Sequence, residues 1–277
     1  MELVNPKTRV CVGKTAQYAV RVYTPPTTSG SFDFDRYALQ GITVEAFSQD
    51  PSVGDFHGAK KGTLTTRTTA PSDEDIDEAG GYEPTPNTAY FTFKAKKAGT
   101  TTLYFEASAH GQYVSDKVSV KVVNCKYKVI IGSQMNWCGP YGCIKFRGVS
   151  TDGQVTADET GYIFTGTAPV YWVSTSKVPN CGAVNSLGIG QVKMRGNLSD
   201  SGQLLLELNY DTVPFTDVVT CPGIGSGSSA LPITPSPLTV TVPSFGGVIQ
   251  LSQQMDGGPE PALGSANVYV IPLESAR

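Results

Sequence analysis

Short segments in which apolar and polar residues alternate recur along the whole chain, and each ends at turn-forming residues. Residues 17–23 (QYAVRVY) alternate before a Thr-Pro-Pro turn, and residues 238–243 (LTVTVP) repeat the pattern much further along. A period of two places one face of a β-strand in a core and the other face in water. No stretch of ten or more residues has the periodicity of a helix. The sequence therefore predicts an all-β protein.

The composition agrees with this prediction and narrows the choice of partners. The chain has 277 residues with 30 glycines and 19 prolines, its net charge is −3, and charged residues make up only 16%. A nucleic-acid or anionic-membrane partner needs a clustered basic surface. The densest group of cations, Lys94, Lys96 and Lys97, is typical of a solvated strand face. No apolar run approaches the ~18 residues of a membrane-spanning helix. We therefore predict no nucleic-acid partner and no membrane span.

A second series of predicted strands begins after residue 124, which predicts two domains, 1–124 and 125–277. A chain of this length exceeds the usual ~100–150 residues of one domain. The strands predicted in the first domain are 9–12, 17–23, 42–47, 89–95, 101–107 and 117–123. Those predicted in the second are 127–131, 144–148, 162–166, 170–173, 190–196, 203–210, 238–243 and 267–272, with a Gly/Ser/Pro loop at 222–237. Long, evenly spaced strands predict that the second domain is an antiparallel β-barrel or a second β-sandwich.

The end of the first domain has a characteristic pattern. Residues 93–100 (FKAKKAGT) lead into a strand that contains Tyr104, and the alternating residues 118–122 (VSVKV) follow. This pattern resembles bacterial Ig-like domains, the sandwich modules of surface adhesins and wall-associated proteins. The resemblance covers residues 1–124 and implies an N-terminal Ig-like β-sandwich, although two segments, 24–40 and 63–87, depart from a minimal module. No family is recognised for the second domain.

Residues 137–140 (WCGP), within the stretch Asn-Trp-Cys-Gly-Pro-Tyr-Gly-Cys that contains Cys138 and Cys143, resemble the opening of a thioredoxin active site. Thioredoxin chemistry needs two sulfurs separated by two residues at the start of a helix, which stabilises the thiolate. Here four residues separate the cysteines, and no helix is predicted after them. Residues 139–142 instead favour a hairpin loop that places Cys138 and Cys143 opposite one another, where a twisted pair can form a disulfide. We predict a structural clip.

Four further cysteines need partners. Cys11 lies in the first predicted strand, and Cys125 lies just beyond the last strand of the first domain. In the Ig-like sandwiches that this domain resembles, the first and last strands run side by side, which implies a Cys11–Cys125 disulfide. Cys181 and Cys221 then pair by elimination, as a ranked choice among many connectivities. Zinc is the alternative for the second domain, but structural zinc sites usually offer closely spaced cysteine pairs, and Cys181 and Cys221 stand alone.

Six cysteines in a helix-poor chain indicate an oxidising compartment. The first six residues have neither a basic nor an apolar region, so they do not form a signal peptide. We therefore expect the mature fragment of an extracellular or cell-envelope protein, with an added initiator Met.

An acidic run supplies the candidate metal site. Asp73, Asp75 and Asp77 are spaced like the start of an EF-hand calcium loop, but Glu78 and Pro84 stand where that loop needs Gly and Glu. The run favours a solvated loop, and a less regular calcium site that adds neighbouring glutamates stays the alternative. No other cofactor is predicted.

No catalytic constellation emerges from the sequence. Residues 13–15 (GKT) resemble the tail of a P-loop, but Thr8 stands where the motif needs Gly, and no helix follows. His57 and His110 lie in polar loops, and no G-x-S-x-G motif is present. We therefore predict that the chain is not an enzyme.

Aromatic residues of the second domain suggest a ligand surface. Tyr162, Tyr171 and Trp172 fall on neighbouring predicted strands, where exposed rings can stack on sugars. Tyr171 and Trp172 are adjacent and point to opposite faces, so at most one of them belongs to such a platform. We predict that Trp172 packs in the core and that Tyr162 and Tyr171 are the candidate ligand-binding residues.

These features predict a non-catalytic extracellular or cell-envelope protein with a role in interaction, adhesion or structure. Loops would be displayed on a rigid, disulfide-stabilised β scaffold. The partner would be a protein or glycan at the cell surface, or copies of the same chain. One alternative is a carbohydrate-binding accessory module, which a buried Trp172 would weaken. Another is a filament or pilus subunit that assembles by strand addition, which an unpaired strand near residues 3–12 or 267–271 would favour.

Overall fold

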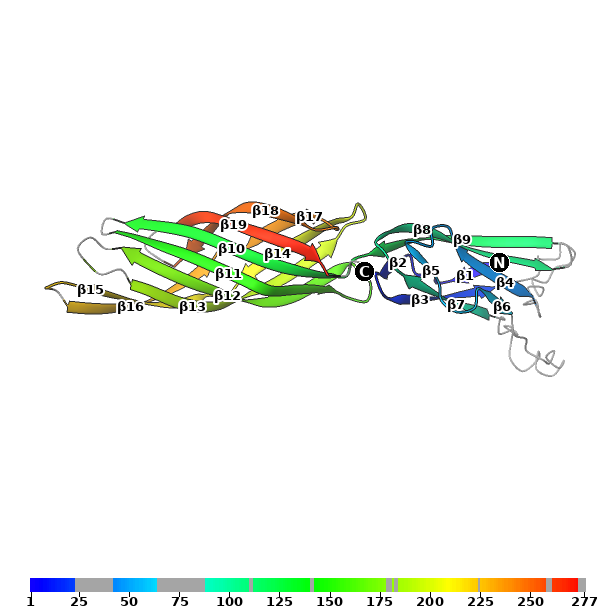
Figure 1. Ribbon diagram of the computed structural model, residues 1–277, viewed down its shortest axis with the longest axis horizontal. Helices are drawn as coiled ribbons and strands as arrows, with labels where there is room; N and C mark the ends of the chain where they lie inside the picture. The colour runs from blue at the N-terminus through cyan, green and yellow to red at the C-terminus, as the bar shows by residue number, and fades with distance from the viewer. Residues whose placement is uncertain are drawn as a thin grey trace, which may run out of the picture. The chain divides into compact units, whose positions relative to one another are not determined.

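The computed structural model of the chain is shown in Figure 1, and all of its regular elements in the described residues are β-strands. The structure describes residues 1–22, 42–63, 88–109, 112–139, 142–177, 181, 184–223, 225–257 and 261–273. The predicted all-β class is confirmed. Within these ranges there is no helix whose length and apolar character would let it cross a membrane. The chain divides into two compact units, unit 1 at Met1–Val123 and unit 2 at Asn124–Ser275.

Unit 1 contains two sheets. The first has the order β1 (Glu2–Val4), β3 (Thr15–Arg21), β7 (Thr88–Ala95), β5 (Gly54–Phe56). The second has the order β2 (Arg9–Cys11), β9 (Gln112–Val123), β8 (Gly99–Ala109), β4 (Thr43–Ser48), β6 (Lys61–Thr63). β2 and β9 run parallel, and the other hydrogen-bonded neighbours run antiparallel. β2, which matches the first predicted strand (9–12), and β9, which contains the last one (117–123), therefore lie side by side.

Aromatic side chains from both sheets form the core of unit 1. Tyr18 of β3 and Phe91 of β7 approach Phe105 of the other sheet, with ring centroids 6.0 and 5.7 Å apart. The Tyr18 ring is buried, and its hydroxyl donates a hydrogen bond to the Lys7 carbonyl at 2.7 Å. Alternation explains this packing, because every second residue of β7 and β8 points inward. Unit 1 is thus a two-sheet sandwich, and its membership of the Ig-like family stays a prediction.

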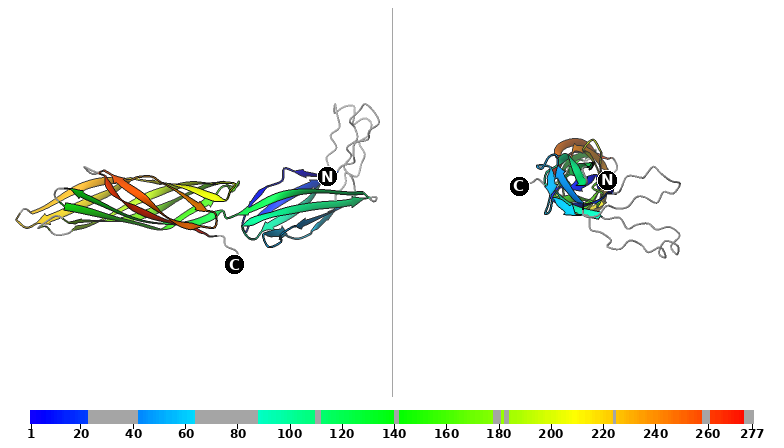
Figure 2. Two further views of the ribbon diagram at one scale, coloured as in Figure 1. Left: turned by 90° about the horizontal axis from the view of Figure 1, so that it is seen from above. Right: turned by 90° about the vertical axis from the view of Figure 1, so that its right-hand side faces the viewer.

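Unit 2 is built on one ten-stranded sheet, and its strands wrap obliquely around a common interior (Figures 1 and 2). The order is β15 (Val213–Cys221), β16 (Gly225–Pro235), β18 (Gly247–Asp256), β19 (Ala262–Pro272), β10 (Lys126–Gly139), β11 (Gly142–Ala157), β12 (Ile163–Lys177), β13 (Val184–Leu198), β14 (Gln203–Tyr210), β17 (Leu238–Pro243). All hydrogen-bonded neighbours are antiparallel. The sheet curls so far that β17, at one edge, contacts β18. The result is barrel-like.

Large side chains fill the interior of unit 2. The inward residues of β14 are Leu204, Leu206 and Leu208, and all three are fully buried. The rings of Phe146 and Phe215 lie 5.5 Å apart between their centroids, so β15 contributes to the same core as β11. Trp172 is 1% exposed, which confirms its predicted place in the core.

The strand predictions for this unit are wrong in four places. Residues 162–166 and 170–173 do not form two strands, because β12 continues through Pro169. The pairing of β12 with β11 stops at Tyr171 and resumes at Thr165. Pro169 lies in this gap, where the missing N–H of proline removes no hydrogen bond to β11.

The other errors concern β15, β16 and β18, and no strand was predicted at β15. β16 lies within the segment predicted as a loop at 222–237, because the hydrogen-bonded hairpin with β15 overrides the weak β propensity of glycine and serine. β18 was missed, because its Ser-Gln-Gln stretch hides the alternation, although Gln253 and Met255 point into the core.

Candidate functional site

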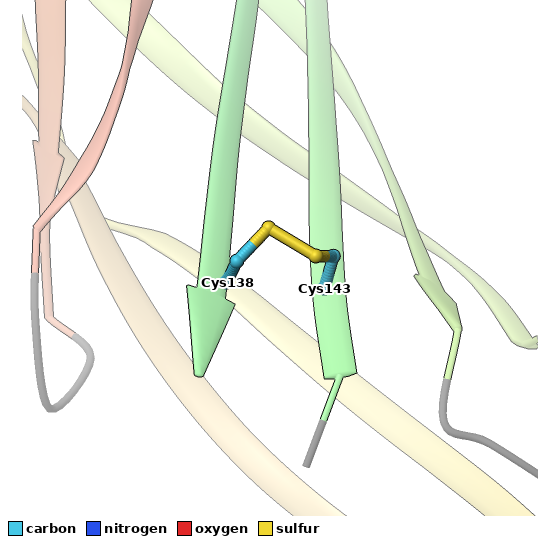
Figure 3. The surroundings of a disulfide bond; sticks show 2 residues. All are labelled: Cys138 and Cys143. Carbon is cyan, nitrogen blue, oxygen red and sulfur yellow. A yellow bond between two sulfur atoms is a disulfide. The ribbon is translucent and has the colours of Figure 1, made fainter. Parts of the chain in front are cut away.

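The Cys138–Cys143 pair closes the hairpin between β10 and β11, as predicted, and Figure 3 shows the disulfide. The two residues are directly opposite in the strand register, with Cα atoms 4.0 Å apart. Both flanking elements are strands, so no helix N-terminus is available to stabilise a thiolate. The pair has the geometry of a structural clip rather than that of a thioredoxin site.

The other described cysteines are also oxidised. Cys11, Cys125 and Cys181 are disulfide-bonded, and no free cysteine occurs in the described part of the chain. A sulfur held in a disulfide cannot act as a thiolate ligand, so the zinc alternative loses Cys138, Cys143 and Cys181. The side chain of Cys221 lies outside the described residues. The pairings Cys11–Cys125 and Cys181–Cys221 stay predictions.

The predicted calcium ligands Asp73, Asp75 and Asp77 lie outside the described residues, and so does His110. Within the described ranges, no three His, Cys, Asp or Glu side chains gather as a metal site would need. The calcium site therefore stays a prediction.

The two candidate ligand-binding tyrosines lie far apart. Tyr162 is in the turn before β12, and its hydroxyl donates a hydrogen bond to Asp200 at 3.4 Å. Tyr171 is in the middle of β12, is 53% exposed, and lies opposite Val149 and Ile189 of the adjacent strands. Nine residues of extended chain separate the two tyrosines by about 30 Å. They do not form one platform.

A polar turn holds Tyr162 in place. The Asp158 carboxylate accepts hydrogen bonds from the backbone N–H and the hydroxyl of Thr160, at 3.1 and 2.6 Å. The bond from the Thr160 hydroxyl is the main cause that lowers the pKa of Asp158. The Tyr162 carbonyl accepts a hydrogen bond from the N–H of Leu198 at 2.9 Å. Tyr162 therefore lies in a structured turn with its side chain 38% exposed, and its role in ligand binding stays a prediction.

The structure has a different concave surface, which the sequence did not reveal. A hollow of about 260 Å³ lies on the outer face of unit 2, across β10, β11 and β19. We call it the Gly132 hollow, and its outward-facing lining includes Gly132, Gln134, Arg147, Ser265, Asn267 and Tyr269.

Gly132 forms the floor of this hollow. Its neighbours Ile131 and Ser133 are buried, so position 132 faces outward. In the register, Gly132 lies between Val149 of β11 and Asn267 of β19. A Cβ atom at Gly132 would have no other atom within 4 Å. The missing side chain thus leaves an open depression between the two adjacent strands.

Hydrogen-bonding side chains surround the floor. Gln134 lies opposite Arg147 on one side and Ser265 on the other. Within the described part of the chain, the side chains of Gln134, Arg147, Ser265 and Asn267 make no hydrogen bond or ion pair. Tyr269 is 39% exposed and supplies an aromatic ring at one end. The hollow therefore combines unpaired polar groups with one partly exposed ring.

No family model and no curated protein matches the chain. A similar solved structure is domains 5–6 of the S-layer protein SbsC, with a TM-score of 0.27 and 11% identity, covering 99% of this chain and 98% of that chain. At this TM-score the likeness carries no inference about fold or function.

Proposed function

We propose that this chain is an exported, non-catalytic scaffold of the cell surface or cell envelope, with a role in interaction or adhesion. The oxidised state of its cysteines carries the proposal. The disulfide-bonded residues are Cys11, Cys125, Cys138, Cys143 and Cys181. Structural disulfides form and persist in oxidising environments such as the cell exterior and the periplasm, and are rare in the cytosol.

The architecture of unit 2 supports a scaffold role. β10 and β11 have 14 and 16 residues and pair from Lys126↔Thr156 to Cys138↔Cys143 and the turn beyond. The disulfide closes this long ladder near its end. Large aromatic side chains occupy the interior, so the outer face and the loops are the surfaces that remain for partners.

The filament alternative has weaker support. Strand addition would be favoured by an unpaired terminal strand, but β1 pairs with β3, and β2 pairs with β9. β19 is hydrogen-bonded on both sides, to β10 and to β18. β19 therefore has no open edge, whereas β1 and β2 are edge strands that are each paired on one side only.

Two measurements test the scaffold proposal together: the compartment in which the chain lies and the oxidation state of its thiols. Cells that produce this chain are treated with a membrane-impermeant protease before and after lysis, and the chain is followed by immunoblot. We expect digestion on intact cells or after opening of the outer envelope alone. In parallel, the purified chain is unfolded and alkylated without reductant, and its intact mass is measured.

All six cysteines of the chain should resist alkylation until reductant is added. The proposal would be overturned if the protease digested the chain only after the cytoplasm was released and if the thiols were alkylated without reductant. A cytosolic marker protein provides the control for cell integrity.

A further inference from the structure

We propose that the Gly132 hollow binds a short saccharide that carries a carboxylate group. The proposal rests on the shape of the hollow, on the unused hydrogen-bonding groups around it and on its charge. It does not depend on the scaffold role, because binding is measured on the purified chain.

The shape favours a small ligand. The volume of about 260 Å³ lies just below the ~300–1,000 Å³ range of small-molecule sites. The floor is a strand glycine that faces open space, so a ligand ring can approach the backbone between Val149 and Asn267. The surface of a folded protein is too broad to contact this floor.

The uncharged polar groups match sugar hydroxyls. The amides of Gln134 and Asn267 each carry donors and an acceptor, and the Ser265 hydroxyl is both donor and acceptor. None of the three side chains has a hydrogen-bond partner in the described part of the chain. A sugar hydroxyl also donates and accepts, so these groups can pair with neighbouring hydroxyls of one ring.

Tyr269 supplies the apolar contact that a sugar ring needs. Its side chain is 39% exposed at the edge of the hollow, opposite Ile130 in the register. A tyrosine presents an apolar ring with a polar tip, which suits the C–H face of a saccharide and its hydroxyl rim. Tyr171 lies on β12, beyond Val149, and does not line the hollow.

Arg147 selects for an acidic sugar. Its guanidinium has no ion-pair partner among the described residues, and none of the described residues that line the hollow is acidic. Lys145, two residues before it on β11, is exposed and adds a second positive charge nearby. The planar fork of arginine binds a carboxylate through two parallel hydrogen bonds. An anionic saccharide therefore fits better than a neutral one.

A matched pair of ligands tests the selectivity. Digalacturonate and its fully methyl-esterified form have the same rings, but only the first carries free carboxylates. Isothermal titration or NMR titration of the full chain should show that the acid binds more tightly than the ester by about tenfold or more. Binding of the acid should weaken as salt is added.

Variants locate the site. Gly132→Val fills the floor with a side chain that strands accept, and Arg147→Gln removes the charge from an exposed position. We expect Gly132→Val to abolish measurable binding of both ligands and Arg147→Gln to remove the preference for the acid. Arg195→Gln, on the outer face of β13, is the matched control and should bind as the unmodified chain does. Thermal unfolding confirms that each variant folds.

Alanine substitutions of Tyr269 and Tyr171 distinguish the Gly132 hollow from the ligand site that the sequence predicts. Tyr269→Ala should weaken binding of digalacturonate, whereas Tyr171→Ala should not. The reverse result would overturn the proposal, and so would equal binding of acid and ester or unchanged binding by folded Gly132→Val. Absence of binding to both ligands would also overturn it, while leaving the scaffold proposal standing.

Discussion

Gly148 lies directly opposite Trp172 on the adjacent strands β11 and β12, and a Cβ atom on Gly148 would come within 2.6 Å of the indole ring. On the other side of Trp172, the register places Gly188 of β13. A Cβ atom there would approach Val213 and Phe215 of β15. Two glycines on the adjacent strands thus leave room for the largest buried side chain of unit 2 and for the strand that packs over it.

This packing predicts that Gly148→Ala destabilises unit 2. The added methyl group must displace the indole in a filled core, which typically costs about 1–3 kcal/mol. Gly132→Ala is the matched control, because its Cβ would lie in open space. Both tryptophans of the chain, Trp137 and Trp172, belong to unit 2, so tryptophan fluorescence in a urea titration reports this unit. Equal midpoints for the two variants would contradict the prediction.

The stability of unit 2 should fall at alkaline pH through Tyr210. This side chain of β14 lies buried beside Gln253 and Ser133, and burial raises its pKa to about 12. The tyrosine of the unfolded chain ionises near pH 10. The free energy of unfolding is therefore at its full value below pH 10 and decreases as the pH rises toward 12, by about 2–3 kcal/mol.

Tyr210→Phe isolates this effect. The hydroxyl of Tyr210 and the polar atoms of Gln253 and Ser133 have no partner in hydrogen-bonding geometry within the described residues. Removal of the hydroxyl should therefore change the stability at pH 7 by less than about 1 kcal/mol. Urea titrations between pH 8 and pH 12 should show a smaller alkaline loss than in the unmodified chain. An unchanged pH profile would show that other groups cause the loss.

The Cys138–Cys143 disulfide should make a modest contribution to stability. The two cysteines are separated by 5 positions, so the bond restricts only a short loop of the unfolded chain. The chain-entropy model gives about 2 kcal/mol for a loop of this size. Replacing both cysteines by serine should lower the urea midpoint of tryptophan fluorescence accordingly. A loss larger than about 4 kcal/mol would mean that the bond also supports native packing.

Unit 1 offers a test of a buried hydrogen bond. The hydroxyls of Ser48 and Thr101 are 2.9 Å apart, and the Thr101 hydroxyl also accepts a hydrogen bond from the Asp50 N–H at 3.0 Å. Thr101→Val keeps the shape but leaves both partners unpaired, which should cost about 1–3 kcal/mol. Thr100→Val, on the exposed face of the same strand, is the control. Hydrogen exchange of the β8 amides should accelerate only in Thr101→Val.

Local patterns predicted much of this fold. The strands expected at 203–210 and 238–243 coincide with β14 and β17, because strict alternation marks a strand with one buried face. The hairpin disulfide depends on neighbours in the sequence, so it was also predictable. Pairing with neighbouring strands produces β16 and lets β12 continue through Pro169. At both places local propensity favoured a loop or turn instead of a strand.

The Gly132 hollow could not be derived in the same way. Its walls come from β10 and β19, which are far apart in the sequence, and a shift of one residue in their register would turn Asn267 and Tyr269 into the core. The prediction places Tyr162 and Tyr171 on two neighbouring strands, but a single strand, β12, begins after Tyr162 and contains Tyr171, and an extended strand keeps such residues apart. The one available signal was the outward alternation of Ser265, Asn267 and Tyr269 around buried Ala266 and Val268.

The pairing of β10 with β19 also sets an order of events during synthesis. β10 to β14 are successive neighbours in the sheet and can form as local hairpins while the chain emerges from the ribosome. The other edge of β10 finds its partner only when Ala262–Pro272 has been made. Until then a nascent chain presents the open backbone of β10 to other chains, which is a template for aggregation. Premature stop codons before β19 should therefore yield insoluble product rather than a smaller folded unit.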